Sequence, residues 1–174
     1  MVRQEAYSCT VARGALAGFI GSVVQVVVGA ALAWAVLPPK HHNNIAPRLV
    51  KRLAQLSGDR KRPIRDWTLG TLFHVGYGLG WGIVLACTRR WSGLPSIALA
   101  GVVSGMIYLL AFSSRGLGTL TATEPSPQAR SWRKQLSLIA VAGAYAFATA
   151  SVEQRLNGRS QCLLPRASLL CFTL

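Results

Sequence analysis

Two polar side chains, Gln25 and His74, stand inside long apolar stretches of this 174-residue chain. An imidazole in such a place can bond a neighbouring helix, ligate a flat macrocycle or relay protons. Gly70 and Gly78 stand one turn before and one turn after His74, which would leave room for a haem or chlorin. However, these stretches hold no second histidine and no charged residue. The sequence therefore favours a hydrogen bond between helices and no cofactor, with a haem- or chlorophyll-type pigment on His74 as the alternative.

The remaining reactive side chains form no recognisable catalytic or metal-binding pattern. His41 and His42 are adjacent, but a zinc site needs three or four ligands and no cysteine or carboxylate is near them in sequence. The four cysteines show no CxxC spacing: Cys9, Cys87, Cys162 and Cys171. All four lie on one side of the membrane in the expected topology, so a disulfide is allowed if that side is oxidising. The five acidic residues are dispersed: Glu5, Asp59, Asp66, Glu124 and Glu153. Since no carboxylates are paired for acid–base work, we expect no enzymatic activity and no bound metal.

The segments that carry Gln25 and His74 are long enough to cross a membrane. Residues 14–37 hold no ionisable group, and a helix of that length reaches about 36 Å, more than the roughly 30 Å of a hydrocarbon core. The run also exceeds the core of about 7–15 residues that a secretory signal peptide has, so we expect a span and not a cleaved leader. Further apolar runs cover 67–88, 94–113 and 136–152. The expected fold is an all-α membrane protein with four transmembrane helices, forming a single domain over residues 1–174.

Residues 38–66 form a basic amphipathic loop between the first two spans. The loop holds eight of the 19 lysines and arginines of a chain whose net charge is +14. Ile45, Leu49, Leu53 and Leu56 follow helical spacing, while Arg48, Lys51 and Arg52 lie mainly toward the other side. This pattern predicts an interfacial helix at about 45–57 whose basic residues bind anionic lipid headgroups or an acidic partner subunit. Aromatic residues and a recognised motif are missing from the loop, so no nucleic-acid partner is expected.

The distribution of basic residues predicts an orientation. With four spans, the loops 38–66 and 114–135 share one side and hold twelve of the 19 lysines and arginines. The N-terminus, the short turn after 88 and the C-terminal tail 153–174 share the other side. Positive-inside bias then places both termini outside the cytoplasm, in what we expect to be a bacterial inner membrane.

Small residues recur at four-residue spacing in every span, which is typical of helices that pack closely in lipid. The expected packing glycines are Gly14 and Gly18, then Gly70, Gly78 and Gly82 on one stripe with Gly76 and Gly80 on an adjacent one, and Gly101 and Gly105. In the fourth span the corresponding residues are Ala140, Ala144 and Ala148. These stripes predict a compact four-helix bundle, although the spacing leaves open whether each partner helix belongs to this chain or to another.

The first span runs into Leu37-Pro38-Pro39-Lys40, and a later span carries His74 followed by Tyr77-Gly78. Over residues 14–88 this arrangement resembles the YagU-like inner-membrane proteins of unknown function, which end their first span in a similar Leu-Pro-Pro-basic sequence. Where that family has an acidic residue about a turn before the proline pair, this chain has Ala33, Trp34 and Ala35. The resemblance implies a topology and no activity.

Taken with the glycine faces and the basic loop, these features favour a small structural or accessory subunit that docks on a larger membrane complex or on itself. The alternative is a small transporter or channel, formed by a homo-oligomer, in which Gln25 and His74 line a path.

Overall fold

The structure, a computed structural model, describes residues 2–36, 48, 50–52, 55, 63–121 and 124–163. Four long helices dominate it: α1 (Val2–Val36), α3 (Pro63–Ser92), α4 (Ser96–Phe112) and α6 (Trp132–Leu163). A one-turn helix α5 (Leu117–Leu120) and a 3₁₀ turn η2 (Pro127–Ala129) lie between α4 and α6. The described residues contain no strand.

Four helical segments have the length and apolar composition needed to cross a membrane: Tyr7–Val36, Thr68–Ser92, Ser96–Leu120 and Trp132–Gly158. The third of them includes both α4 and α5. The predicted all-α fold with four membrane helices is therefore confirmed, and the chain is an integral membrane protein. The first, second and fourth helices are longer than their predicted apolar runs. The fourth differs most, because α6 continues beyond 152 through Glu153, whose charge is compensated by Arg89 inside the bundle.

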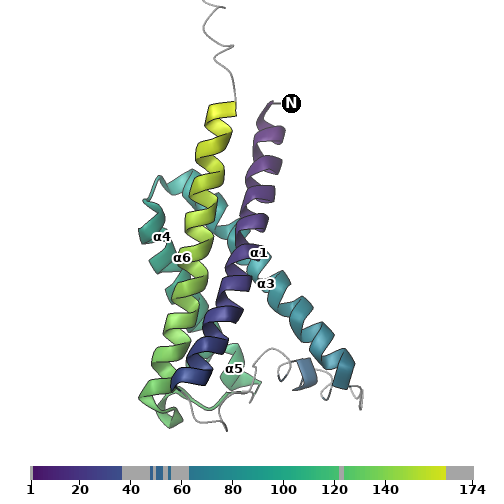
Figure 1. The fold of residues 1–174 in the computed structure, drawn as a ribbon, viewed down its shortest axis with the longest axis vertical. Coiled ribbons are helices and arrows are strands. Elements are labelled where there is room, and N and C mark those ends of the chain that lie inside the picture. Colours follow the sequence, from purple (N-terminus) through teal and green to yellow (C-terminus); the bar gives the residue numbers. More distant parts are fainter. Residues whose placement is uncertain are drawn as a thin grey trace, which may run out of the picture.

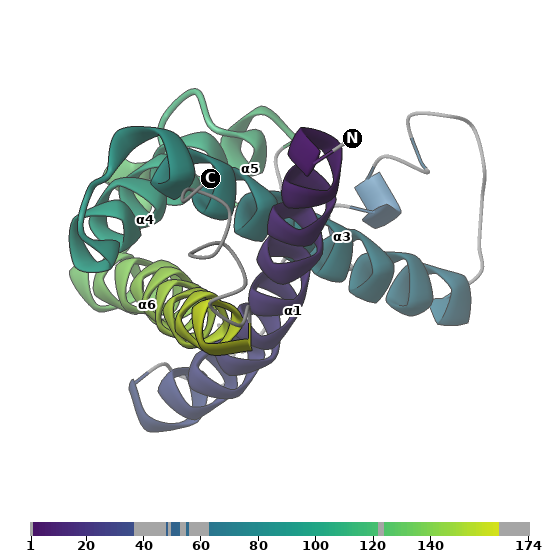
Figure 2. The same ribbon diagram turned by 90° about the horizontal axis from the view of Figure 1, so that it is seen from above.

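The helices run alternately up and down, with α1 and α6 side by side (Figure 1). Packing of α1 is against both α3 and α6, whereas α4 packs mainly against α6. Seen from above, α3 crosses α1 obliquely and its first half points away from the other long helices (Figure 2). The start of α1 and the end of α6 lie at one end of the molecule, and the α4–α6 connection lies at the other (Figure 1).

A tight turn joins α3 to α4, as the short spacing between the predicted spans required. Gly93 has φ of 63°, a left-handed conformation that glycine adopts without a Cβ clash. Its backbone N–H donates to the carbonyl of Arg89 at 3.3 Å, which closes the end of α3. The antiparallel hairpin of α3 and α4 follows from this turn.

The core lies between α3, α4 and α6, with Tyr77 and Trp81 packed against its edge. It is formed by Leu85, Ala100, Val103, Ile107, Ala142, Tyr145, Ala146 and Ala150. The fully buried alanines of α6 are therefore 142, 146 and 150, whereas in the predicted stripe Ala140 is exposed and Ala144 and Ala148 are half-buried. In a helix so rich in alanine, the large side chain of Tyr145 decides which face turns inward.

Only part of the predicted interfacial helix at 45–57 falls within the described residues. Arg48, Val50, Lys51, Arg52 and Gln55 are helical, and Arg52 Nη1 donates to Gln55 Oε1 at 3.3 Å. The three basic side chains are exposed. Lipid binding by Arg48, Lys51 and Arg52 stays a prediction.

Candidate functional site

The closest helix contact is the crossing of α1 and α3, where glycines of both helices meet. A Cβ added at Gly14 would lie 2.8 Å from the carbonyl oxygen of Gly82, and one added at Gly18 would collide with the carbonyl of Gly78. Without side chains the two backbones approach to a distance that no larger residue permits. Gly14, Gly18, Gly78 and Gly82 thus lie where close packing requires them, and Gly70 is also buried.

Four other predicted packing glycines lie outside the contacts of the described chain. A Cβ added at Gly76, Gly80, Gly101 or Gly105 would meet no atom within 4 Å. They make no close helix contact within the described residues, and their packing against a helix of another chain stays a prediction. Their stripes face outward because the partner helix occupies the neighbouring face of α3, and because α4 turns Ala100 and Val103 to the core instead.

The crossing continues into a polar junction of α1, α3 and α6. Ser22 Oγ donates to the carbonyl of Gly18 at 3.0 Å, and Tyr145 Oη donates to the carbonyl of Gly78 at 2.5 Å. Thr149 Oγ1 donates to the Tyr145 carbonyl at 2.8 Å. These bonds satisfy the hydroxyl groups within an apolar bundle, where an unpaired polar group is costly. Tyr145 and Thr149 were absent from the sequence prediction, although a tyrosine and a threonine four residues apart in an alanine-rich span were a usable signal.

His74 lies beside this junction, on the side of α3 that meets α1. The imidazole lies against the backbone of Ser22 on α1. The hydrogen bond between helices that the sequence favours for His74 stays a prediction. The Nε2 atom of His74 is buried and has no hydrogen-bond partner in the described part of the chain. The place that a Cβ would take at Gly78 is filled by Ser22 Oγ and the Gly18 backbone of α1. A macrocycle on His74 stays an untested alternative.

Gln25 stands on a different face of α1. It lies between Gly21, which faces Thr149 and Tyr145, and Gly29, which faces Val141. Residues four apart share a helix face, so Gln25 is directed toward α6 while His74 meets α1 from α3. Among the described residues no hydrogen bond joins the two side chains, and Gln25 is half-buried. They do not form one site within a single copy of the chain.

Replacing His74 with glutamine tests the packing interpretation. Glutamine keeps a polar group against α1, so we expect a loss of only about 0.6 kcal/mol of stability, the average for a hydrogen bond between membrane helices. Thermal unfolding in mild detergent measures the loss, and an absorption spectrum of the purified wild type tests for pigment. A coloured wild type that turns colourless in His74→Gln while keeping its fold would show that His74 ligates a macrocycle instead.

Three arginines at the end that holds the start of α1 and the end of α6 are bonded within the protein. Arg89 forms an ion pair with Glu153, which joins α3 to α6. Arg13 Nη1 donates to Asn157 Oδ1 at 3.0 Å, joining α1 to α6. Arg90 Nη1 donates to Thr10 Oγ1 at 3.1 Å, and the Arg90 guanidinium stacks over the ring of Tyr7, 4.8 Å from its centroid. Three helices are tied together here by arginine.

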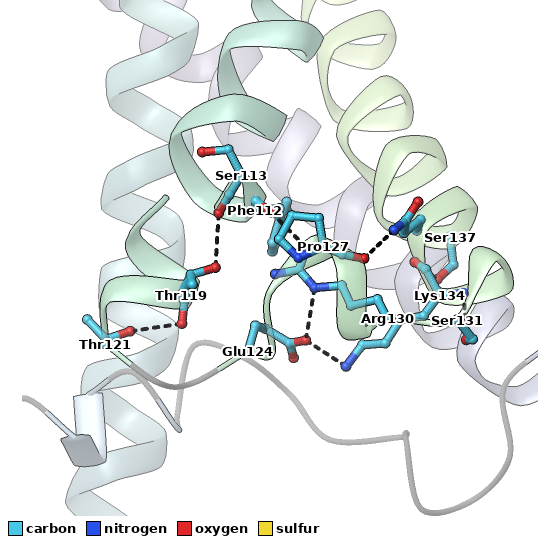
Figure 3. A network of polar contacts seen from close by, with 12 residues as sticks. Phe112, Ser113, Thr119, Thr121, Glu124, Pro127, Arg130, Ser131, Lys134 and Ser137 are labelled. Atoms are coloured by element: carbon cyan, nitrogen blue, oxygen red, sulfur yellow. Dashed lines mark hydrogen bonds and ion pairs between the residues drawn. The ribbon is translucent and has the colours of Figure 1, made fainter. Parts of the chain in front are cut away.

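At the opposite end, a second polar cluster closes the α4–α6 connection (Figure 3). Arg130 Nη1 donates to the carbonyl of Phe112 at 2.8 Å, which caps the end of α4 with a positive charge. Glu124 Oε2 lies 2.6 Å from Lys134 Nζ and 4.0 Å from Arg130 Nε. The side chains of Glu124 and Arg130 are fully buried, so one carboxylate compensates the charge of a buried guanidinium and of Lys134. The arrangement suits a rigid connection, because the carboxylate of Glu124 lies close to the positive charges of Arg130 and Lys134.

The described residues contain no group of three histidine, cysteine, aspartate or glutamate side chains that could hold a metal ion. Cys9 is exposed and Cys87 is half-buried, and both are free. His41, His42, Cys162 and Cys171 lie outside the described residues, so the disulfide hypothesis is open for that part of the chain.

Comparison with known proteins gave no match to a family model, to a curated protein or to a solved structure. The resemblance to the YagU-like proteins therefore stays a prediction.

Proposed function

We propose that this chain is a structural or accessory subunit that docks on other membrane chains through outward-facing glycines. The main support is the contrast between the two sets of glycines. One set packs α1 against α3, while a Cβ added at Gly101 or Gly105 of α4 would meet no atom within 4 Å. Glycine weakens a helix interior by roughly 0.5–1 kcal/mol relative to alanine, so its presence on an outward face favours contact with a second helix over contact with lipid alone.

The outward face of α4 also has the shape that such docking needs. Ile97 and Leu109 are exposed on the same stripe as the two glycines, one turn before and one turn after them. Large side chains thus flank a strip where another backbone can approach closely. Gly76 and Gly80 of α3 offer a second strip of the same kind.

The experiment is extraction in mild detergent, followed by mass spectrometry of the chains that copurify. We expect unrelated membrane chains with the wild type and their loss in the variant Gly101→Leu/Gly105→Leu, whose own thermal stability stays within about 0.5 kcal/mol because no neighbour is displaced. Leu110→Ala, an exposed change on another side of α4, is the matched control and should keep the partners. Recovery of homo-oligomers alone would favour the transporter or channel, and wild-type partners in the double variant would contradict docking through α4.

We further propose that the membrane is a bacterial inner membrane and that both termini lie outside the cytoplasm. The support is the excess of lysine and arginine in 38–66 and 114–135, the segments between the spans. Topology reporters fused at Gly58 and after Leu174 should give opposite signals, cytoplasmic for the first. Equal signals would contradict the four-span topology, and an inverted pair would contradict only the orientation.

A further inference from the structure

The α4–α6 connection presents large apolar side chains at the end of the membrane helices. Leu117 is 48% exposed, Leu120 72% and Trp132 66%. They belong to α5 and to the first residue of α6, both at the end away from the start of α1 and the end of α6 (Figure 1). Such side chains are stable where hydrocarbon and headgroups meet, and tryptophan is enriched at that depth.

Two arginines at the same end are available for an external anion. Arg115 is exposed and forms no ion pair or hydrogen bond within the described part of the chain. Arg133 is exposed, and its guanidinium stacks over the ring of Trp132, 5.6 Å from the centroid. At the opposite end, Arg13, Arg89 and Arg90 are bonded to side chains of other helices, while Arg155 of α6 is exposed.

The connection is also held in place before any ligand binds. Arg130 caps α4 and Lys134 is paired with Glu124 (Figure 3). In addition, Gln135 Nε2 donates to the carbonyl of Pro127 at 2.5 Å. The buried charges of Glu124 and Arg130 are compensated within the cluster, together with Lys134. Arg115 and Arg133 are not part of this cluster. A rigid connection that carries two exposed arginines loses little conformational entropy when an anion binds.

We infer that this connection is a seat for anionic phospholipids, in which Arg115 and Arg133 bind headgroup phosphates while Leu117, Leu120 and Trp132 lie among the upper acyl chains. A lipid fits this surface better than an acidic protein does, because the surface combines basic and large apolar side chains. A bilayer offers both partners at this depth, phosphate groups next to hydrocarbon. The inference does not depend on the proposed docking through α4.

The test is native mass spectrometry of the full chain in detergent with equal amounts of phosphatidylglycerol and phosphatidylcholine. We expect the wild type to retain phosphatidylglycerol preferentially. Arg115→Gln/Arg133→Gln should lower that preference by roughly five-fold for each arginine removed, as expected for a basic residue near an anionic surface. Arg115→Lys/Arg133→Lys keeps both charges and should retain most of the preference.

Arg155→Gln is the matched control, since Arg155 is exposed near the other end of α6, and it should behave as the wild type does. Thermal unfolding of each variant without added lipid checks that the fold is intact. Unchanged selectivity in Arg115→Gln/Arg133→Gln would overturn the inference, and so would an equal loss in Arg155→Gln. If the double glutamine variant keeps its lipid but loses a copurifying acidic chain, the surface binds protein and the lipid inference is wrong.

Discussion

Replacing Gly78 with leucine is expected to destabilise the protein by about 3 kcal/mol or more, near the upper end for overpacking a tight interface. A Cβ at this position would collide with Ser22 Oγ and lie 3.2 Å from the Gly18 carbonyl oxygen, so α1 and α3 would have to separate. The shift would also move the Gly78 carbonyl away from Tyr145 Oη, its hydrogen-bond donor on α6. One substitution thus disturbs contacts among three helices.

Gly80→Leu is the matched control for this prediction. The position lies on the same helix, two residues away, and a Cβ there meets nothing within 4 Å. The same chemical change should therefore alter stability by no more than about 0.5 kcal/mol. Thermal unfolding of both variants in mild detergent compares them, and equal losses would contradict the packing of α1 on α3.

The existence of four membrane helices was predictable, since exclusion of charge from lipid leaves long apolar runs. The ends of the helices were less predictable, because a charged residue is tolerated inside a bundle when a residue of another helix forms an ion pair with it. Arg89 and Glu153 lie 64 residues apart, and no local pattern links them. The prediction therefore ended the fourth span at 152, whereas α6 passes through the paired carboxylate.

The glycine stripes show what local spacing leaves undetermined. Gly78 and Gly82 pack against α1, yet Gly76 and Gly80 have the same spacing and face outward. Spacing identifies a stripe, but the position of the neighbouring helix selects one stripe over the other. Similarly, Arg130 and Arg133 count alike toward the basic charge of residues 114–135. The structure buries Arg130 against the Phe112 carbonyl and exposes Arg133.

Replacing Arg89 with leucine should have the other large effect, a loss of about 3–5 kcal/mol. Glu153 is the acidic partner of Arg89, and its side chain is only 7% exposed. Without the guanidinium, a carboxyl group is left inside an apolar bundle with neither its ion pair nor access to water, and this desolvation is the source of the cost. The opposite change, Glu153→Leu, should cost less, because Arg89 is 21% exposed and its long stem can carry the charge toward the headgroups.

The double variant Arg89→Leu/Glu153→Leu separates the cost of an unpaired charge from a general loss of packing. With both charges removed, two apolar side chains meet between α3 and α6, and stability should return to within about 1 kcal/mol of the wild type, because an apolar pair often replaces a buried ion pair without loss. Thermal unfolding in mild detergent of both single variants and the double variant completes the cycle. If the two single losses simply add, the ion pair contributes nothing to holding α6 against α3. In that case α6 is held in the bundle by its contacts with α1 and α4 and not by the ion pair of Arg89 and Glu153.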